Sequence, residues 1–119
     1  MSDLRRDGDF LSDIQDAIRR ILEYTANMKW DEYLRDYKTQ DAVVRNLEVV
    51  GEATKNLSNC LKDQHPGIPW KEMAGTRDRL THHYFGVNQE IVWQIVEHDL
   101  PELYKQIKQV FRDFSEGES

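Results

Sequence analysis

The stretch FLSDIQDAIRRILEYTANM, residues Phe10–Met28, carries the pattern that predicts the fold. Apolar or small side chains recur in it at every third or fourth position: Phe10, Ile14, Ile18, Ile21, Thr25 and Met28. Because one turn of an α-helix takes about 3.6 residues, side chains at this spacing share one face. The stretch therefore predicts an amphipathic helix from about Leu4 to Met28, with one face buried in a core.

The same spacing continues downstream. Trp30 to Tyr37 fits a short helix, and a longer one is expected from about Gln40 to Leu61, with Thr39 as its N-cap. The apolar face of the longer helix comprises Val43, Leu47, Val50, Thr54, Leu57 and Leu61. Gly51 lies inside this helix at a cost on the order of 1 kcal/mol relative to alanine. We therefore expect another helix to approach closely at Gly51.

The segment HPGIPW, His65–Trp70, is the clearest break in the helical pattern because it holds two of the three prolines. Proline is favoured in the first turn of a helix and glycine just beyond its end. We therefore expect a helix from about Pro69 to about Phe85, ended by Gly86.

A final helix is expected from about Gln89 to Phe114. Pro101 lies within it and cannot donate a backbone hydrogen bond, so a kink or break is expected near Asp99–Leu100. The tail 115–119 is expected to be frayed. Strand-like alternation and internal repeats are absent from the sequence. The predicted fold class is all-α, an up-and-down bundle of four to five helices in one domain, residues 1–119.

Composition restricts the function classes. The 119 residues are 32% charged with a net charge of −6, which argues against broad electrostatic capture of nucleic acid but permits a local basic site. The single cysteine permits no internal disulfide and fits a reducing cytoplasm. No apolar run approaches the roughly 20 residues that span a membrane, and no apolar signal core opens the chain. A soluble, cytoplasmic protein is expected.

The stretch RDRLTHHYFG, Arg77–Gly86, departs from the core pattern. On a helical wheel, one stripe would hold Trp70, Met73, Leu80 and Tyr84, with Arg77 in the middle of it. An unpaired guanidinium in a core costs several kcal/mol. The stripe is therefore expected to meet either a carboxylate or a solvated cleft.

Two further groups adjoin this arginine in the predicted helix. Asp78 and His82 are four residues apart, and an acid beside an imidazole fixes its tautomer. Arg77 and His82 lie about 140° apart around the axis, a gap that a long side chain or a two-fold dimer could close. Arg79 would point to the opposite side, into solvent. Spacing alone leaves open a paired arginine at the edge of the core and a structural histidine.

These residues resemble a known family, the HepT-like toxins of the HEPN superfamily, which are small all-α ribonucleases. The family motif is an arginine, a polar residue, three further positions, a histidine, any residue and a tyrosine. The matching residues here are Arg77, Asp78, His82 and Tyr84. Runs similar to the family's also flank the motif in order: RNLEVVGEATKNLS (45–58), IPW (68–70), YFGV (84–87) and IVW (91–93). The resemblance spans about Asp9 to Leu103.

The resemblance implies a metal-independent endoribonuclease that needs no cofactor and acts as a homodimer, with its cleft at the dimer interface. It also implies a partner, the minimal nucleotidyltransferase antitoxin MntA, which transfers AMP to the motif tyrosine, here Tyr84. Asp78 stands where the family often has asparagine, and Thr76 where it often has methionine. Neither departure breaks the motif.

The mechanism expected from these residues is attack of a ribose 2′-OH on the adjacent phosphate of a tRNA or mRNA. His82 would move the proton, and Arg77 would hold the phosphate and stabilise its developing charge. Asp78 would orient His82. Arg45 and Lys71, from either subunit, would add a basic lining to the cleft.

Two alternatives compete with a ribonuclease. Glu48 and Glu52, one turn apart, could bind a metal with His98, but the Glu-x-x-His repeats of such sites are missing, so no metal is expected. The two glutamates are expected instead to pair with Arg45 or Lys55, or to approach Arg77. The second alternative is a protein without catalysis. It would be either a module that binds a nucleotide or a partner protein through the same arginine and histidine, or a plain dimerising bundle with no site, which leaves Arg77 unexplained.

Overall fold

The computed structural model describes residues 2–82 and 86–118, with side chains for residues 6–81 and 86–117. Helix α1 (Ser2–Tyr24) forms from the stretch whose spacing predicted it. Leu11, Ile14, Ile18 and Ile21 on its apolar face are fully buried. The predicted amphipathic helix is therefore confirmed, but its predicted end is wrong: α1 ends at Tyr24, so Thr25 and Met28 lie beyond it. Leu11 belongs to the buried face although the prediction did not include it.

Helix α2 (Trp30–Arg35) is short, as expected, and helix α3 (Tyr37–Lys55) follows it almost at once. The N-cap of α3 is Asp36, so the prediction of Thr39 as the cap is wrong. The Asp36 carboxylate accepts hydrogen bonds from the Thr39 backbone N–H (3.0 Å) and hydroxyl (2.7 Å). These hydrogen bonds, the backbone one first, lower the pKa of Asp36 because they favour its charged form.

Helix α3 ends at Lys55, six residues before the predicted end, and helix α4 (Asn59–Gln64) is a separate element. The interruption has a chemical cause at Ser58, which caps α4 by accepting a hydrogen bond from the Leu61 N–H (3.2 Å). The buried carboxylate of Asp7 in α1 accepts hydrogen bonds from the Ser58 N–H (2.8 Å) and hydroxyl (2.5 Å). A long-range contact therefore accompanies the end of a helix whose local pattern would continue.

The predicted helix over 69–85 is wrong in its extent. It is divided into α5 (Trp70–Ala74) and α6 (Thr76–Leu80), with Gly75 between them, and it ends at Leu80. The hydroxyl of Thr76 donates to the Met73 carbonyl at 2.6 Å, a side-chain bond that competes with the regular helical ladder. Thr76 and Leu80 are the buried residues of α6.

Beyond α6 the chain forms two short strands that the sequence did not suggest. Strands β1 (Thr81–His82) and β2 (Gly86–Val87) pair antiparallel, with Thr81 opposite Val87 and His82 opposite Gly86. Gly86 has a φ of +76°, a left-handed conformation that favours glycine. Gly86 therefore belongs to this hairpin. The prediction that it ends a helix is wrong.

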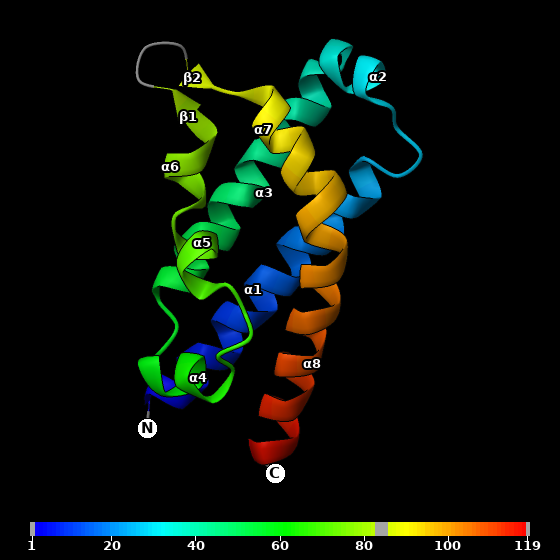
Figure 1. The fold of residues 1–119 in the computed structure, drawn as a ribbon. Coiled ribbons are helices and arrows are strands. Elements are labelled where there is room, and N and C mark those ends of the chain that lie inside the picture. Colours follow the sequence, from blue (N-terminus) through cyan, green and yellow to red (C-terminus); the bar gives the residue numbers. More distant parts are fainter. Residues whose placement is uncertain (1, 83–85, 119) are drawn as a thin grey trace.

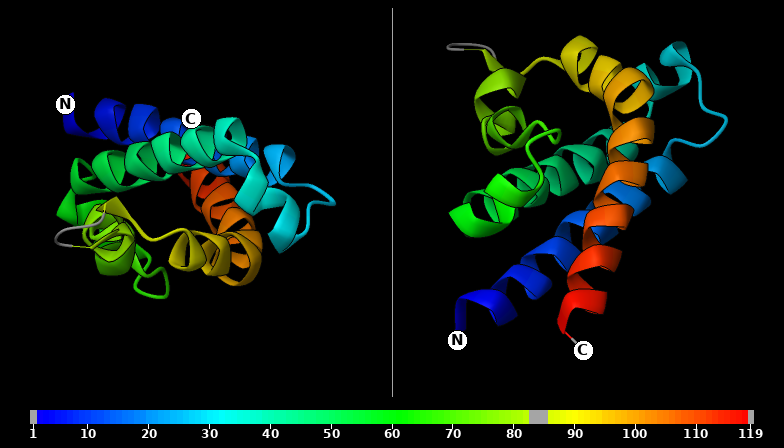
Figure 2. Two further views of the ribbon diagram at one scale, coloured as in Figure 1. Left: turned by 90° about the horizontal axis from the view of Figure 1, so that it is seen from above. Right: turned by 60° about the horizontal axis from the view of Figure 1, so that its bottom comes forward.

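The last segment is one continuous rod: helix α7 (Gln89–Gln94), the π-helical segment η1 (Ile95–Asp99) and helix α8 (Leu100–Glu118). Figure 2 shows the chain changing direction between α7 and α8, so the predicted kink near Asp99–Leu100 is present and the predicted break is not. The kink takes the form of a π-helical turn, in which the Leu100 N–H donates to the Ile95 carbonyl. Pro101 removes a donor and crowds the preceding turn, and a wider turn relieves both. Residues 115–118, expected to fray, have helical backbone.

Helix α3 lies at the centre of the fold, with α1 on one side and α5 and α6 on the other (Figures 1 and 2). Helix α8 packs against α1, and the buried apolar side chains form one cluster between these helices. Met73 O lies 3.3 Å from an ideal Cβ built on Gly51, which confirms the predicted close approach at this glycine. The all-α class is thus confirmed. Within the described residues, no helix is long and apolar enough to cross a membrane.

Candidate active site

Arg77 lies on the exposed side of α6. Because α6 is a separate helix, Thr76 and Leu80, four residues apart, form its buried side and Arg77 turns outward. The prediction that Arg77 interrupts a buried stripe is therefore wrong. The arginine needs no buried counter-charge. After the break at Gly75, α6 buries Thr76 and Leu80 and leaves Arg77 on its exposed side.

Arg77 nevertheless lines a cavity, as the alternative of a solvated cleft predicted. The cavity has a volume of about 260 Å³ and lies between α3, α5 and α6. Its charged lining consists of Arg45, Glu48, Glu52, Lys55 and Arg77. The predicted approach of the two glutamates to Arg77 across the helix packing is thus confirmed, and three cations face two carboxylates.

The cations of this cavity are not committed to ion pairs. Among the side chains that the structure describes, the ion pairs join Arg19 to Asp16 and Glu23, Arg35 to Asp31, and Arg79 to Asp99. Arg45, Lys55 and Arg77 take part in none of them. The predicted pairing of Glu48 and Glu52 with Arg45 or Lys55 is therefore not formed. The guanidinium of Arg77 is free to bind an anionic ligand in a solvated cavity.

A second cavity, of about 190 Å³, lies between α3 and α1. Arg45, Glu48 and Glu52 line both cavities, and Phe10 and Asp13 of α1 close the second one. Because the two cavities share these three residues, we refer to them together as the groove on α3. Arg45 lines the same cavity as Arg77, whereas Lys71 is exposed on α5 and is not among the cavity's lining residues.

The remaining predicted site residues follow Arg77 in the chain. Asp78 is exposed on α6, and His82 lies in β1, where the structure describes its backbone only. Because α6 ends at Leu80, Asp78 and His82 are not neighbours on one helix, and the predicted i,i+4 geometry is wrong. Tyr84 lies outside the described residues. Any contact between Asp78 and His82 therefore has to cross the junction between α6 and the hairpin.

Arg79 was expected to be solvated. Its guanidinium lies 3.6 Å from the Asp99 carboxylate of η1, and both side chains are about half exposed. An exposed pair of this kind stabilises a protein little. Its position is informative, because it turns Arg79 away from the cavity of Arg77 and toward the rod of α7, η1 and α8.

The largest of these cavities, about 430 Å³, was not predicted. Buried Leu47, Val50, Leu100 and Leu103 form its floor, and Glu72, Arg79, His98, Asp99 and Glu102 lie among its polar lining. These residues come from segments far apart in sequence, so no local pattern could indicate them. His98 lines this cavity and not the groove of Glu48 and Glu52, and no metal-binding group of three or more residues occurs in the described part of the chain.

Comparisons with known proteins agree with the motif around Arg77. Residues 14–110 match the family described as "Ribonuclease HepT-like". A protein of Methanocaldococcus jannaschii, named as a candidate RNase, is 49% identical over 109 residues, which cover 92% of this chain and 89% of that protein. A protein of Thermococcus cleftensis, named "Probable ribonuclease HepT", is 48% identical over 99 residues, covering 83% of this chain and 90% of that protein. No solved structure matches.

Proposed function

Because this chain belongs to the HepT-like ribonuclease family, we propose that it is a metal-independent endoribonuclease and the toxin of a toxin–antitoxin pair. The observation that carries the proposal is the free guanidinium of Arg77, which lines an open cavity next to Arg45 and Lys55. Three cations and two carboxylates leave the cavity one positive charge in excess, which suits the single negative charge of a phosphodiester. RNA, as tRNA or mRNA, is the proposed substrate.

The proposed reaction is transesterification within the RNA strand. The 2′-oxygen of one ribose attacks the neighbouring phosphorus, the bond from phosphorus to the 5′-oxygen breaks, and a 2′,3′-cyclic phosphate forms. His82 takes the 2′-OH proton or supplies one to the leaving 5′-oxygen, because an imidazole titrates near neutral pH. Arg77 stabilises the charge that develops on the non-bridging oxygens.

Asp78 is proposed to orient His82. Since α6 ends between the two residues, this contact would run from the last turn of the helix to the hairpin. Arg45 is proposed to hold the RNA backbone from α3. Lys71, exposed on α5, is proposed as a more distant phosphate contact.

We also propose a homodimer in which the second copy completes the cleft, because Arg77 is exposed and its cavity opens at the surface. The partner that silences the enzyme would be a minimal nucleotidyltransferase of the MntA type, which transfers AMP to Tyr84. Tyr84 and Arg77 are seven positions apart in the sequence. We propose that an AMP on that tyrosine silences the enzyme because its phosphate competes with RNA for the same cations.

The test is cleavage of mixed cellular RNA in the presence of a chelator, with the fragment ends mapped. Wild type should cleave and leave 2′,3′-cyclic phosphates. His82→Ala should lose activity by about 10²–10⁴-fold, and Arg77→Ala by about 10²–10³-fold. Arg79→Ala is the matched control, because Arg79 lies on the same short helix but outside the cavity, and it should cleave like wild type.

Loss of activity in chelator with rescue by Mg²⁺ would contradict the metal-independent mechanism. An inactive wild type with an unmodified intact mass would favour a non-catalytic binding module. The AMP proposal is tested on the same protein, since incubation with the nucleotidyltransferase and ATP should add AMP to wild type but not to Tyr84→Phe. AMP transfer to Tyr84→Phe with full inhibition would assign the modification to another residue.

A further inference from the structure

We propose that Tyr37, the first residue of α3, is a stacking platform for an unpaired base of the RNA. The inference rests on the proposed ribonuclease function and extends its site from the cavity of Arg77 along α3. It identifies the substrate as single-stranded at this position, since a base inside a duplex presents no free face to an aromatic ring.

The first observation is the exposure of the ring. Tyr37 is 74% exposed, well above Tyr24 (44%) and Leu34 (42%), the other large exposed hydrophobic side chains in the described part of the chain. The nearby aromatic cluster, Trp30, Tyr33 and Trp93, is packed within itself, and Tyr37 is not part of it. The ring of Tyr37 therefore contributes little to the core and is largely accessible to a ligand.

The second observation is the rigidity of its position. Asp36 caps α3 through its two hydrogen bonds to Thr39. The side-chain amide of Gln40 donates to the carbonyls of Tyr33 (2.8 Å) and Leu34 (3.1 Å), which ties the first turn of α3 to α2. A ring on a fixed helix start loses little conformational freedom when a base stacks on it.

The third observation is the alignment of Tyr37 with the candidate active site. Tyr37, Asp41, Arg45, Glu48 and Glu52 follow one another at intervals of three or four residues, so they share one face of α3. Arg45 lines the cavity of Arg77. Tyr37 and Arg45 are eight positions apart, about 12 Å along the helix, a distance that a short single strand can span.

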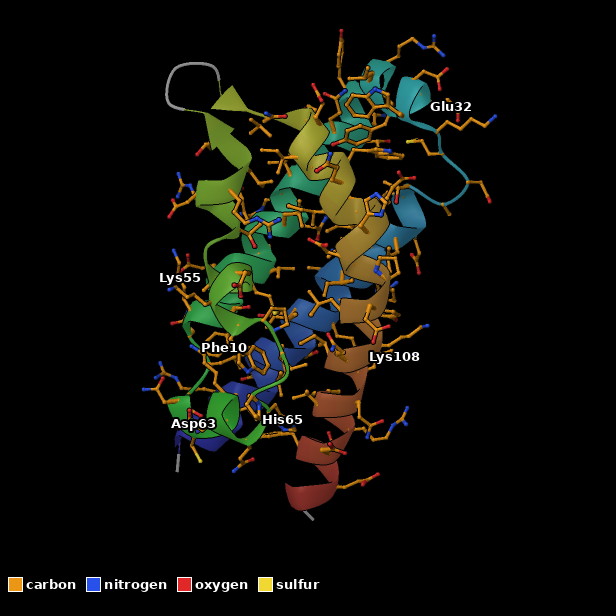
Figure 3. The ribbon with its side chains drawn as sticks, in the orientation of Figure 1. Phe10, Glu32, Lys55, Asp63, His65 and Lys108 are labelled. Atoms are coloured by element: carbon orange, nitrogen blue, oxygen red, sulfur yellow. The ribbon has the colours of Figure 1, made fainter. Side chains whose placement is uncertain are left out.

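The direction of the strand follows from the same face. Figure 3 shows Glu32 of α2 at the upper right and Lys55, at the C-terminal end of α3, at mid-height on the left, so the two ends of α3 are well separated. The cavity of Arg77 includes Lys55, whereas Tyr37 starts α3 beside α2. An RNA with its scissile phosphate at Arg77 would therefore follow α3 toward α2 to reach Tyr37.

Charge explains why stacking matters in this protein. The net charge is −6, and Asp41 lies between Lys38 and Arg45 on the proposed path, so long-range attraction for phosphates is weak. Stacking does not depend on net charge and is sequence-tolerant. An aromatic platform therefore supplies affinity where the electrostatic contribution is small.

The experiment measures binding separately from cleavage. A fluorescent single-stranded 2′-O-methyl RNA of about ten nucleotides, which lacks the attacking hydroxyl, is titrated with full-length His82→Ala protein and followed by anisotropy. Added to this background, Tyr37→Ala should weaken binding about tenfold, and Tyr37→Phe should restore most of it because the ring remains. Tyr24→Ala removes another exposed tyrosine, at the end of α1, and should bind like the background protein.

A second series of RNAs identifies the nucleotide whose base contacts Tyr37. Abasic nucleotides are introduced one at a time along the same RNA. One abasic position should weaken binding to the background protein but not to Tyr37→Ala, because the stacking partner is already lost. The loss caused by Tyr37→Ala should also change little with salt, unlike that of Arg45→Ala.

If wild type cleaves RNA but Tyr37→Ala binds RNA as tightly as the background protein, this inference is overturned and the proposed function is not. Tyr37→Ala could instead change the oligomeric mass and leave the RNA affinity of each assembled site unchanged. That result would assign the ring to a protein contact and would also overturn the inference. If wild type neither cleaves nor binds RNA, the proposed function fails first.

Discussion

Asp7 is the buried acid on which the junction between α3 and α4 depends. Its side chain is only 1% exposed, and its carboxylate accepts both hydrogen bonds that Ser58 can donate, from the backbone and from the hydroxyl. These contacts join residues 51 positions apart in sequence. They allow the chain to leave α3 and start α4 with its polar groups satisfied.

We predict that Asp7→Ala lowers the free energy of unfolding by about 1–3 kcal/mol, because it leaves the two Ser58 donors without a partner. Urea denaturation followed by circular dichroism measures the change. Asp9→Ala is the matched control, since Asp9 is exposed two residues away and should change stability little. Equal stability of the two variants would show that water replaces the carboxylate at no cost.

Arg77 shows how one residue can satisfy both the fold and the chemistry. Its place between buried Thr76 and exposed Asp78 turns the guanidinium toward the groove on α3, where Glu48 and Glu52 lie without forming ion pairs to it. The cost of burying an unpaired charge does not arise. The arginine remains available for a phosphate, which is the property that the proposed mechanism uses.

At the scale of elements, Gly51 sets how closely α3 and α5 pack. An ideal Cβ on Gly51 would lie 3.3 Å from the Met73 carbonyl oxygen and 3.6 Å from that of Ala74. Both atoms belong to backbone, which moves less readily than the end of a side chain. The glycine therefore weakens α3 locally but lets α5 lie directly against it, which positions α6 and Arg77.

We predict that Gly51→Ala destabilises the protein by about 1 kcal/mol or more, because the cost of overpacking exceeds the gain in helix propensity. Gly117→Ala is the matched control. Gly117 also lies in a helix, α8, but no atom approaches its ideal Cβ within 4 Å. The control should leave stability unchanged or raise it slightly, and thermal unfolding of both variants compares them. A stabilised Gly51→Ala would mean that α5 shifts easily.

At the scale of the whole molecule, the proposed dimer determines which groups share one active site. Arg77 and His82 lie on different elements, α6 and β1, and Arg77 is exposed. A two-fold axis near this surface would bring the arginine of one copy to the histidine of the other. The solution mass should then be twice the 14.1 kDa of one chain, as light scattering can measure.

Mixing two inactive variants tests this arrangement. If each site takes Arg77 from one copy and His82 from the other, refolding Arg77→Ala together with His82→Ala should recover about a quarter of wild-type cleavage, by random pairing. Each variant refolded alone is the control and should stay inactive. A dimeric but inactive mixture would show that both groups of a site come from the same copy.

Local pattern was sufficient where the core itself is periodic. The spacing of Ile14, Ile18 and Ile21 predicted α1 and its buried face, and the prolines of His65–Trp70 predicted the break before α5. Gly51 within a helix indicated a close neighbour. The motif around Arg77 indicated the family, because a family signature depends on residue identity and order and not on the local backbone.

Long-range packing decided the rest. The contact between Asp7 and Ser58 accompanies the early end of α3, and the hydroxyl of Thr76 and the pairing of β1 with β2 accompany the end of the predicted helix before His82. Each of these contacts competes with the helical hydrogen bonds that the local sequence favours. Their strength depends on partners that only the folded chain brings together, so the cavities and the outward turn of Arg77 could not be deduced from spacing along one helix.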